Sequence, residues 1–483
     1  MVTTIGKKKD KVTVRCVGMS STEVTGSSYL IECPTGEKIL LDCGIYQSSK
    51  PFEDYKINKN KFNFKPKDLS AVIISHANAD HFALLPKLVH DGADCNIYIA
   101  KENIDFMKPM LEDSAKIMER DVQSFGRRYK KSYSPIYTID DVKDTLPLFR
   151  GCTKHENHYI TENVWFRLLD AGHIFGSCQI ELYIKLPSGV IKKIVYSGDL
   201  GNTMFEQPFV DKFTPILKCS LFIGETTYNT PERSVKKEQR QKDLDIIKTV
   251  ILQTCIDQNG IVLIPTFALQ RTETMLYTLW KLFGEDKSFN IPIVVDSPLA
   301  VKLLDCYQQN LDGIWLDEFN KMMQWKNIRI IRTVEESMMN VTDTSPKVVL
   351  SSSGMLQQGR SVVYLKKILP RNNCSILTCG YMAQGSLGWK IKNNSAQRTI
   401  NIDKKPYPNR CNIFNLDTFS SHMQYESLLN YYTNLANNGC EVIWLVHGDK
   451  KKNQFKEALE SKIRKIFKTT KIVATNKDTV ARI

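Results

Sequence analysis

The chain has 483 residues, of which 42% are hydrophobic and 24% are charged, so it is long enough for two domains and has the composition of a soluble globular protein. No apolar stretch approaches the roughly 18 residues of a membrane span, and the N-terminus lacks the apolar core of a secretory signal. The thirteen cysteines include no C-x-x-C pair, which argues against a zinc ribbon and favours reduced thiols and a cytoplasmic location. The net charge of +14 favours a polyanionic partner.

The first 200 residues read as short strands separated by turn signals. The predicted strands cover residues 12–17, 29–33, 38–42, 71–75, 96–100, 164–170, 179–186 and 191–197. Apolar residues at 82, 84, 85, 88 and 89 predict a helix over 80–90, and residues 101–130 are typical of a charged helix.

The pattern changes near residue 211 to longer helices alternating with buried strands at 261–265, 291–296 and 347–351, which indicates a parallel sheet. After residue 407 the earlier pattern returns, with strands at 412–416 and 441–447 and a helix from about 453. The sequence therefore predicts one domain interrupted by another. We expect the first part at 1–207, the insert at 208–400 and the second part at 401–483.

The run from Ser75 to His81 (SHANADH) carries two imidazoles, a carboxylate and an amide directly after a predicted buried strand. Ligands bind at the carboxyl ends of strands in open α/β sheets, and these side chains are the ligands of zinc or a similar metal. A polar loop that happens to contain two histidines is the alternative.

Further candidates stand at the ends of other predicted strands or in Gly- or Ser-flanked turns. They are Asp42, His173, Asp199, His422 and His447. One such residue would be unremarkable, but several in a chain with only eight histidines favour a shared site. The histidines at 90, 155 and 158 have no such setting, and we expect them to lie outside it.

The order of these residues resembles the metallo-β-lactamase fold with a β-CASP insert. Within it the chain resembles the cleavage-and-polyadenylation endonucleases and, with no extension before residue 12, their compact bacterial ribonuclease relatives. Supporting motifs are EVTGS at 23–27, IGETTY at 223–228, SPLA at 297–300, SSSGML at 351–356 and GYMAQGSLG at 380–388. The resemblance implies an α/β protein, an αββα metallo-β-lactamase sandwich with an inserted α/β domain of mainly parallel sheet.

The resemblance also implies two Zn²⁺ ions and a role for each candidate. One ion would be held by His76, Asn78, His173 and Asp199, and the other by Asp80, His81, Asp199 and His447, with Asp199 bridging. Asp42 would orient a ligand histidine or the bridging water. Glu225 and His422 would form an acid–histidine pair in which His422 protonates the leaving oxygen or contacts the scissile phosphate.

Single-stranded RNA is the substrate that the resemblance implies, cleaved internally or from its 5′ end, with the insert closing over the metal crevice as a lid. Its phosphates would meet the turns near residues 351–354 and 380–386, and the RNA-binding candidates are Ser352, Ser353, Gly354, Arg360, Tyr381, Gln384 and Ser386. The basic runs at 127–131 and 236–237 would serve phosphates or be solvated helix faces. Association of two copies of the chain into a homodimer is left as an open alternative.

Asn78 departs from the family pattern, which has histidine at this position. An amide oxygen carries no charge and is a weaker zinc ligand than an imidazole. Three interpretations remain: a natural adaptation to a weaker or different metal, a deliberately inactivated sequence, or a catalytically silent RNA-binding relative. A metallo-hydrolase of another substrate class is a further alternative, which the implied lid disfavours.

Overall fold

The computed structural model describes residues 2–4, 10–380, 382, 385–393, 398–463 and 470–483. It divides into two compact units. The first unit consists of Met1–Met204, Val210–Ser234 and Ser421–Ile483, and the second of Phe205–Phe209 and Val235–Ser420.

The first unit contains two sheets. The larger has the strand order β1 (Val2–Thr4), β23 (Val480–Arg482), β2 (Thr13–Cys16), β3 (Tyr29–Glu32), β4 (Lys38–Leu41), β5 (Ala71–Ile73), β6 (Ile97–Ala100) and β7 (Phe149–Cys152). The other has the order β22 (Lys471–Ala474), β21 (Val442–Val446), β12 (Leu221–Glu225), β11 (Ile191–Tyr196), β10 (Cys178–Lys185), β9 (Val164–Asp170) and β8 (His158–Tyr159). β4 to β7 are mutually parallel, as are β11, β12, β21 and β22.

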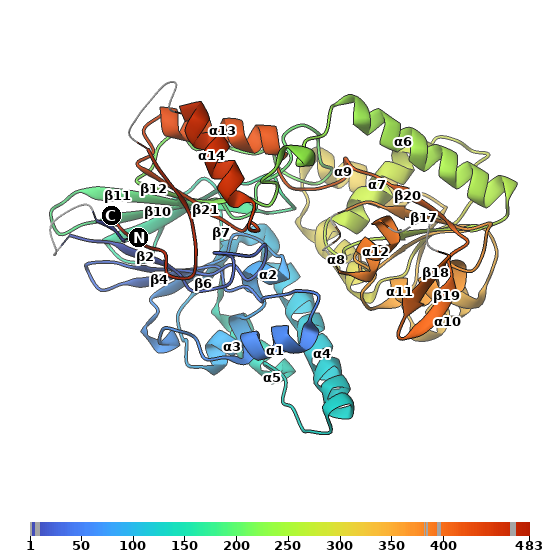
Figure 1. Ribbon diagram of the computed structural model, residues 1–483, viewed down its shortest axis with the longest axis horizontal. Coiled ribbons are helices and arrows are strands. Elements are labelled where there is room, and N and C mark those ends of the chain that lie inside the picture. The colour runs from blue at the N-terminus through green and yellow to red at the C-terminus, as the bar shows by residue number, and fades with distance from the viewer. Residues whose placement is uncertain (1, 5–9, 381, 383–384, 394–397, 464–469) are drawn as a thin grey trace. The chain divides into compact units, whose positions relative to one another are not determined.

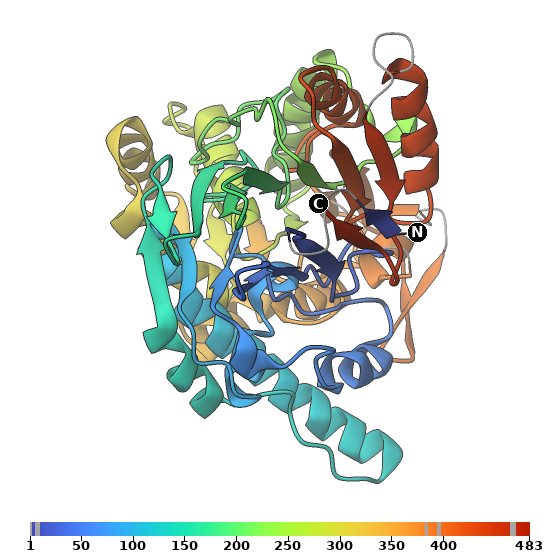
Figure 2. The ribbon, with the colours of Figure 1, turned by 90° about the vertical axis from the view of Figure 1, so that its left-hand side faces the viewer.

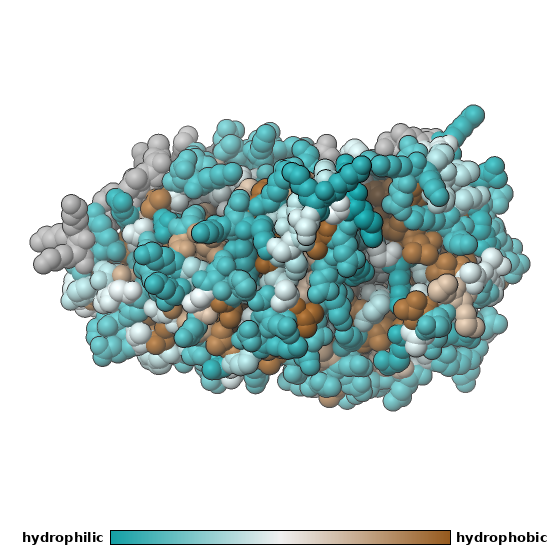
Figure 3. All heavy atoms as spheres, turned by 90° about the horizontal axis from the view of Figure 1, so that it is seen from below, coloured by the Kyte–Doolittle hydropathy of each residue, from teal (hydrophilic) through white to brown (hydrophobic). Residues whose placement is uncertain are grey.

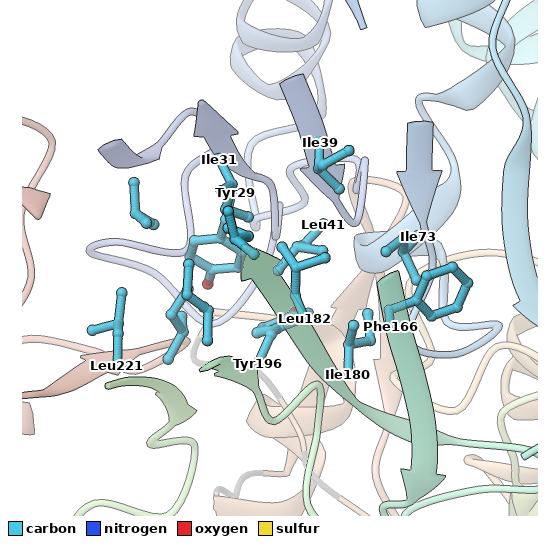
Figure 4. Close-up of a cluster of buried hydrophobic side chains, with 14 of the residues drawn as sticks. Tyr29, Ile31, Ile39, Leu41, Ile73, Phe166, Ile180, Leu182, Tyr196 and Leu221 are labelled. Carbon is cyan, nitrogen blue, oxygen red and sulfur yellow. The ribbon is translucent and has the colours of Figure 1, made fainter. Parts of the chain in front are cut away.

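The two sheets pack face to face over one hydrophobic core. Alternate residues of each strand point to this face because the side-chain period of a strand is two. Figure 4 shows side chains of the first sheet, such as Ile39 and Leu41, meeting those of the second, such as Ile180 and Leu182, and all four are fully buried.

Helices cover the outer faces and complete four layers (Figure 1). α1 (Pro51–Lys59), α2 (Ala79–Phe82), α3 (Leu85–His90), α4 (Ile104–Tyr129) and α5 (Ile139–Thr145) lie on the side of the first sheet. α13 (Tyr425–Asn437) and α14 (Lys452–Ile463) lie on the side of the second, where their apolar faces join a separate core cluster. The αββα architecture expected from the sequence is confirmed.

The second unit is built on a six-stranded, entirely parallel sheet. Its order is β15 (Ile328–Ile330), β14 (Ile293–Val295), β16 (Lys347–Ser351), β13 (Ile261–Pro265), β17 (Ser375–Thr378) and β20 (Asn412–Asn415). An antiparallel hairpin is formed by β18 (Thr399–Ile402) and β19 (Lys405–Pro408). The helices are α6 (Glu238–Ile251), α7 (Arg271–Phe283), α8 (Pro298–Asn310), α9 (Gly313–Met323), α10 (Val334–Thr342), α11 (Arg360–Ile368) and α12 (Leu387–Asn393).

The division between the units differs from the expected boundaries at 208 and 400. β12, which lies within the predicted insert, completes the second sheet of the first unit between β11 and β21. β20, predicted to belong to the interrupted domain, pairs in parallel with β17 in the second unit. Both strands pair with partners that sequence pattern alone does not identify. The helix predicted over 80–90 is split into α2 and α3.

No helix in the described part of the chain is long and apolar enough to cross a membrane. The face seen in Figure 3 is mostly hydrophilic, with hydrophobic residues scattered over it.

Candidate metal centre

The predicted metal-site residues lie in the first unit, most of them at the carboxyl ends of strands, while Asp80 and His81 lie in the short helix α2. Asp42 directly follows β4, His76 follows β5, His173 follows β9, Asp199 follows β11 and His447 follows β21. β4 and β5 run parallel, and so do β9, β11 and β21, so that in each sheet these strand ends share an edge. Residues from both ends of the chain are brought together in this way.

The first cluster consists of His76, His173 and Asp199, whose ligand atoms all lie within 4.8 Å of one another. Asp199 Oδ2 is 3.7 Å from His76 Nε2 and 3.6 Å from His173 Nε2. All three side chains are buried.

The second cluster consists of Asp80, His81 and His447. Asp80 Oδ2 is 3.7 Å from His81 Nε2 and 3.3 Å from His447 Nε2. The other oxygen of Asp199, Oδ1, lies 3.3 Å from His81 Nε2 and 3.5 Å from His447 Nδ1. The Asp199 carboxylate therefore faces the first cluster with one oxygen and the second with the other.

Close backbone contacts fix the loops that carry these residues. Gly44 lies against the backbone of Asp80, where a Cβ atom would come within 1.6 Å of the Asp80 carbonyl oxygen. Gly201 lies as tightly against Gly172, next to His173, where a Cβ would be 1.7 Å from a carbonyl oxygen. Only glycine fits these positions, so both close backbone contacts depend on it.

Asp42 contacts the His81 ring directly and the His76 ring through Ser75. Its Oδ2 lies 2.6 Å from His81 Nδ1 and accepts hydrogen bonds from Ser75 Oγ and Tyr196 Oη, each at 2.7 Å. Its Oδ1 accepts a bond of 2.7 Å from the backbone N–H of Ser75. Ser75 Oγ also lies 2.9 Å from His76 Nδ1. Both histidines are thus held through Nδ1, which leaves Nε2 for the clusters.

The donor set fits a divalent metal of the zinc type. Buried imidazole Nε2 atoms and carboxylates are zinc's preferred nitrogen and oxygen ligands. His76 Nε2, His81 Nε2 and Asp199 Oδ1 are buried and make no aligned hydrogen bond within the described part of the chain. Buried polar atoms are normally satisfied, so unsatisfied ones in both clusters favour a bound cation there.

The pKa shifts of the histidines in the two clusters also favour a bound cation. Burial and the neighbouring His81 hold the pKa of His76 well below its usual value, and burial with His422 lowers the pKa of His173 to about 3. Burial also lowers the pKa of His81, but the carboxylates of Asp199, Asp80 and Asp42 outweigh it and raise that pKa well above the ordinary value. These shifts favour the neutral imidazoles of His76 and His173 that a metal requires, while the carboxylates around His81 favour positive charge there, which a proton or a cation supplies.

Asn78 lies beside the first cluster. It is the N-terminal capping residue of α2, and its amide Nδ2 is 3.3 Å from His173 Nε2. The position that the family pattern gives to a third imidazole is thus filled by a neutral amide.

Glu225 and His422 form the expected acid–histidine pair, with His422 Nδ1 3.2 Å from Glu225 Oε1. The Glu225 carboxylate also accepts hydrogen bonds from the backbone N–H groups of Leu200 and Thr227, at 2.9 and 2.8 Å. Burial lowers the pKa of His422, but Glu225 outweighs it and the net shift is upward. The His422 ring centroid is 4.5 Å from that of His173, so the pair adjoins the first cluster.

The expected RNA-binding residues belong to the second unit and are engaged within it. Ser352 Oγ is 2.8 Å from Ser297 Oγ, and Ser353 Oγ donates to the Gln358 carbonyl at 3.1 Å. Arg360 forms an ion pair with the buried carboxylate of Asp296. Ser386 Oγ accepts a bond of 3.0 Å from the N–H of Trp389 at the start of α12. Gly354 packs beside Phe267, while Tyr381 and Gln384 lie outside the described residues.

Three contributors to the site were not assigned a role from the sequence. Ser75 and Tyr196 hold Asp42, and Thr227 Oγ1 lies 3.0 Å from His447 Nδ1. Each stands within three residues of a predicted functional residue. That proximity was the available signal, but hydroxyl residues are too common at strand ends for it to be specific.

The remaining histidines lie elsewhere. His90 pairs with Asp141 at 2.7 Å and His155 with Asp170 at 2.7 Å, while His158 donates to the Thr153 carbonyl at 2.8 Å. None of the three belongs to either cluster in the described part of the chain.

Three family models match the chain. Residues 21–158 match the metallo-beta-lactamase superfamily, residues 272–391 the Beta-Casp domain, and residues 406–471 the Zn-dependent metallo-hydrolase RNA specificity domain. The matched residues thus fall on both structural units.

Several curated proteins are similar along most of their length. Ribonuclease TTHA0252 of Thermus thermophilus is 30% identical over 445 residues, which cover 89% of this chain and 92% of that protein. An RNase J-like protein of Methanocaldococcus jannaschii is 28% identical, with 90% of each chain covered. The transcription termination factor FttA of the same organism is 27% identical, with 95% of this chain and 70% of that protein covered. By sequence, fold and site geometry, the chain is a member of the metallo-β-lactamase/β-CASP family of RNA-processing metallo-hydrolases.

Proposed function

We propose that this protein is a zinc-dependent ribonuclease that hydrolyses phosphodiester bonds of single-stranded RNA. The observation that carries the proposal is the Asp199 carboxylate, which faces His76 and His173 with one oxygen and His81 and His447 with the other. Relatives named ribonuclease and RNase J-like support RNA as the substrate.

Two Zn²⁺ ions are the cofactor that we propose. His76, His173 and Asp199 would hold one ion, with the Asn78 amide as a weak additional ligand, and Asp80, His81, His447 and Asp199 would hold the other. When bound, such a pair lowers the pKa of water toward neutrality and neutralises charge that develops on a phosphate. Asp42 would keep the His81 ring oriented.

The chemical step needs a proton donor for the leaving group. The oxygen of a water molecule attacks phosphorus and the water releases a proton to the solvent, the bond between phosphorus and the ribose O3′ breaks, and O3′ must gain a proton. We assign that proton to His422, because Glu225 holds its Nδ1 at 3.2 Å and favours the protonated ring. The products are a 5′-phosphate and a 3′-hydroxyl.

The RNA strand would be positioned by the second unit. Ser352, Ser353, Gly354, Arg360, Tyr381, Gln384 and Ser386 are the proposed contacts. The Asp296 carboxylate offsets the charge of Arg360, so we expect this arginine to orient a phosphate rather than to add much net attraction. Cleavage within the strand is the expected mode, with removal of nucleotides from a 5′ end as the second.

A silent RNA-binding relative is the second candidate, and Asn78 is the observation that favours it. An amide within 3.3 Å of His173 Nε2 occupies the ring's lone pair if the NH₂ group points toward it. In this case the protein would bind RNA but would not cleave it in a metal-dependent reaction.

A cytoplasmic location is part of the proposal. All thirteen cysteines are thiols and none forms a disulfide, which suits a reducing compartment.

Cleavage of an end-labelled single-stranded RNA tests the proposed function. The chain is stripped with a chelator, assayed, reloaded with Zn²⁺ and assayed again, alongside a thioester substrate. We expect cleavage of RNA only after reloading and no turnover of the thioester. Asp80→Ala should abolish cleavage, while Asp94→Ala, an exposed carboxylate elsewhere in the same unit, should not. RNA binding without cleavage under every metal condition would favour the silent relative instead.

A further inference from the structure

The end of α4 carries a cluster of aromatic and basic side chains that the metal centre does not use. α4 extends away from the sheets in Figures 1 and 2, and its last turns pack against α1. We call this surface the α4 tip; it comprises Phe52, Tyr55, Phe125, Arg127, Arg128, Tyr129, Lys130, Lys131 and Tyr133.

The aromatic rings of the α4 tip form one contiguous group. Phe52 stacks on Tyr129 with centroids 4.3 Å apart and meets Phe125 edge-on at 5.1 Å. Tyr133 lies 5.4 Å from Phe52 and 5.9 Å from Tyr55, whose hydroxyl donates to the Ser134 carbonyl at 2.9 Å. The rings are therefore held by one another, yet Tyr129 remains 37% exposed.

The cations of the α4 tip are unopposed. Arg127, Arg128, Lys130 and Lys131 are exposed, and no acidic residue occurs between positions 122 and 139. None of the four forms an ion pair with a carboxylate in the described part of the chain, although many other lysines and arginines do. The guanidinium of Arg128 lies 5.3 Å from the ring centroid of Tyr129.

Helix stability does not explain this surface. Cations near a helix C-terminus interact favourably with its dipole, but the effect is confined to the last turn. Lys131 lies beyond the helix end, and half-exposed stacked rings gain nothing from the dipole. Exposed rings interleaved with unpaired cations are instead the usual means of binding single-stranded nucleic acid, since bases stack on rings and phosphates meet the charges.

The α4 tip is firmly connected to the metal centre. Asn103, the residue before α4, donates to the carbonyl of Gly176 at 2.8 Å, close to His173 in the chain. α1 follows the loop after Asp42, and Asn58 within it accepts from and donates to the backbone of Tyr46 at 2.9 and 2.8 Å. At 1.5 Å per residue, Phe125 stands on the order of 30 Å along the helix from the start of α4. Only an RNA of many nucleotides could contact both places.

We propose that the α4 tip is a second binding surface for the single-stranded RNA substrate, which holds the strand away from the metal centre. The inference rests on the proposed function for the identity of the ligand. The RNA would stack a base on Tyr129 and form ionic contacts with Arg127, Arg128, Lys130 and Lys131. The α4 tip would therefore recognise negative charge and unpaired bases rather than a particular nucleotide sequence.

Cleavage kinetics on RNAs of two lengths test the proposal. The variants are Arg127→Gln/Arg128→Gln/Lys130→Gln/Lys131→Gln, which removes the charges and keeps polar side chains, and, separately, Tyr129→Leu, which removes the aromatic ring and keeps an apolar side chain. The matched control replaces four exposed lysines elsewhere in the first unit by glutamine, at Lys185, Lys212, Lys218 and Lys477. Thermal unfolding of each variant verifies folding.

We expect the fourfold variant to raise KM for an RNA of roughly 30 nucleotides by about tenfold or more, with kcat unchanged and no change for one of roughly 6 nucleotides. The slope of log K against log salt for binding the long RNA should fall by up to about 2.8, at about 0.7 for each lost phosphate contact. Tyr129→Leu should raise KM for the long RNA without altering the slope.

Two outcomes would overturn the proposal. One is an unchanged KM for the long RNA, or a change equal to that of the control variant. The other is unchanged RNA affinity with lost binding to vesicles containing anionic phosphatidylserine, which would assign the surface to a membrane. Binding measured by fluorescence anisotropy separates this inference from the proposed function: tip-dependent RNA binding without any metal-dependent cleavage refutes only the latter.

Discussion

Asp42 Oδ2 lies 2.6 Å from His81 Nδ1, and this contact turns Nε2 of the same ring toward Asp80 and Asp199. The carboxylate is fully buried and is itself held by Ser75 and Tyr196. A residue outside both clusters thus orients the ring of a histidine that we propose as a ligand.

Replacing Asp42 by asparagine should weaken metal binding without unfolding the protein. The amide keeps the shape but loses the charge that holds His81 Nδ1, and losses of this kind typically cost about 10- to 100-fold in affinity or activity. Competition with a chromophoric chelator measures the zinc Kd. Asp54→Asn, a buried carboxylate that binds Ser48, is the control and should leave the Kd unchanged. Equal Kd values for wild type and Asp42→Asn would show that Asp42 does not support metal binding.

Asn78→His should strengthen the first cluster. An imidazole at this position adds a nitrogen ligand beside His173 Nε2, where the amide lies at 3.3 Å. Elemental analysis after dialysis against limiting zinc should show a higher zinc content per chain, and RNA cleavage should be faster by about tenfold or more. Asn96→His, on the exposed surface, is the control. If neither zinc content nor rate increases, position 78 is not a ligand position.

His422→Ala should slow the chemical step and leave the metal in place. General acids typically contribute about 100- to 10,000-fold, and the ring touches the first cluster without belonging to it. Glu225→Gln should have a smaller effect in the same direction, because it removes the charge that favours the protonated ring but leaves the ring itself in place. Single-turnover cleavage and metal content are measured together. A loss of metal from His422→Ala would make it a ligand instead.

Because of Glu273, the free energy of unfolding of the second unit should fall as the pH rises. Burial raises its pKa from 4.5 to about 8, and its carboxylate oxygens have no hydrogen-bond partner among the described residues. Between these values the unfolded chain loses a proton that the folded chain keeps, so unfolding becomes easier as pH increases, by on the order of 5 kcal/mol at most. Above about pH 8 both states are ionised and the decrease ends.

The comparison of wild type with Glu273→Gln isolates this contribution. The variant has no proton to lose, so its Tm relative to wild type should rise steadily from pH 5 to pH 8. Parallel Tm curves for the two proteins over that range would show that Glu273 is ionised in the folded state.

Residue pattern identified the side chains that cluster in the first unit more fully than it identified the domain boundaries. Candidate ligands at strand ends are visible in a sequence because a buried strand followed by His or Asp is a local signal, as for His76 after β5 and His447 after β21. Strand pairing is not local. β12 is buried throughout and lacks alternation, and nothing in its residues reveals that it pairs with β21, more than 200 positions later.

The supporting contacts were harder to foresee than the ligands. Tyr196 reaches Asp42 across 154 positions, and Thr227 reaches His447 across 220. Their hydroxyls have no pattern that separates them from other polar residues. Arg360, by contrast, is identified by its motif, but only the structure reveals that Asp296 offsets its charge.

A zinc-edge anomalous difference map from a crystal of the zinc-loaded protein tests the central claim most directly. The account predicts one peak among His76, His173 and Asp199 and a stronger one among Asp80, His81 and His447, since Asn78 weakens the former. The absence of an anomalous peak at both clusters in a zinc-saturated crystal would contradict it.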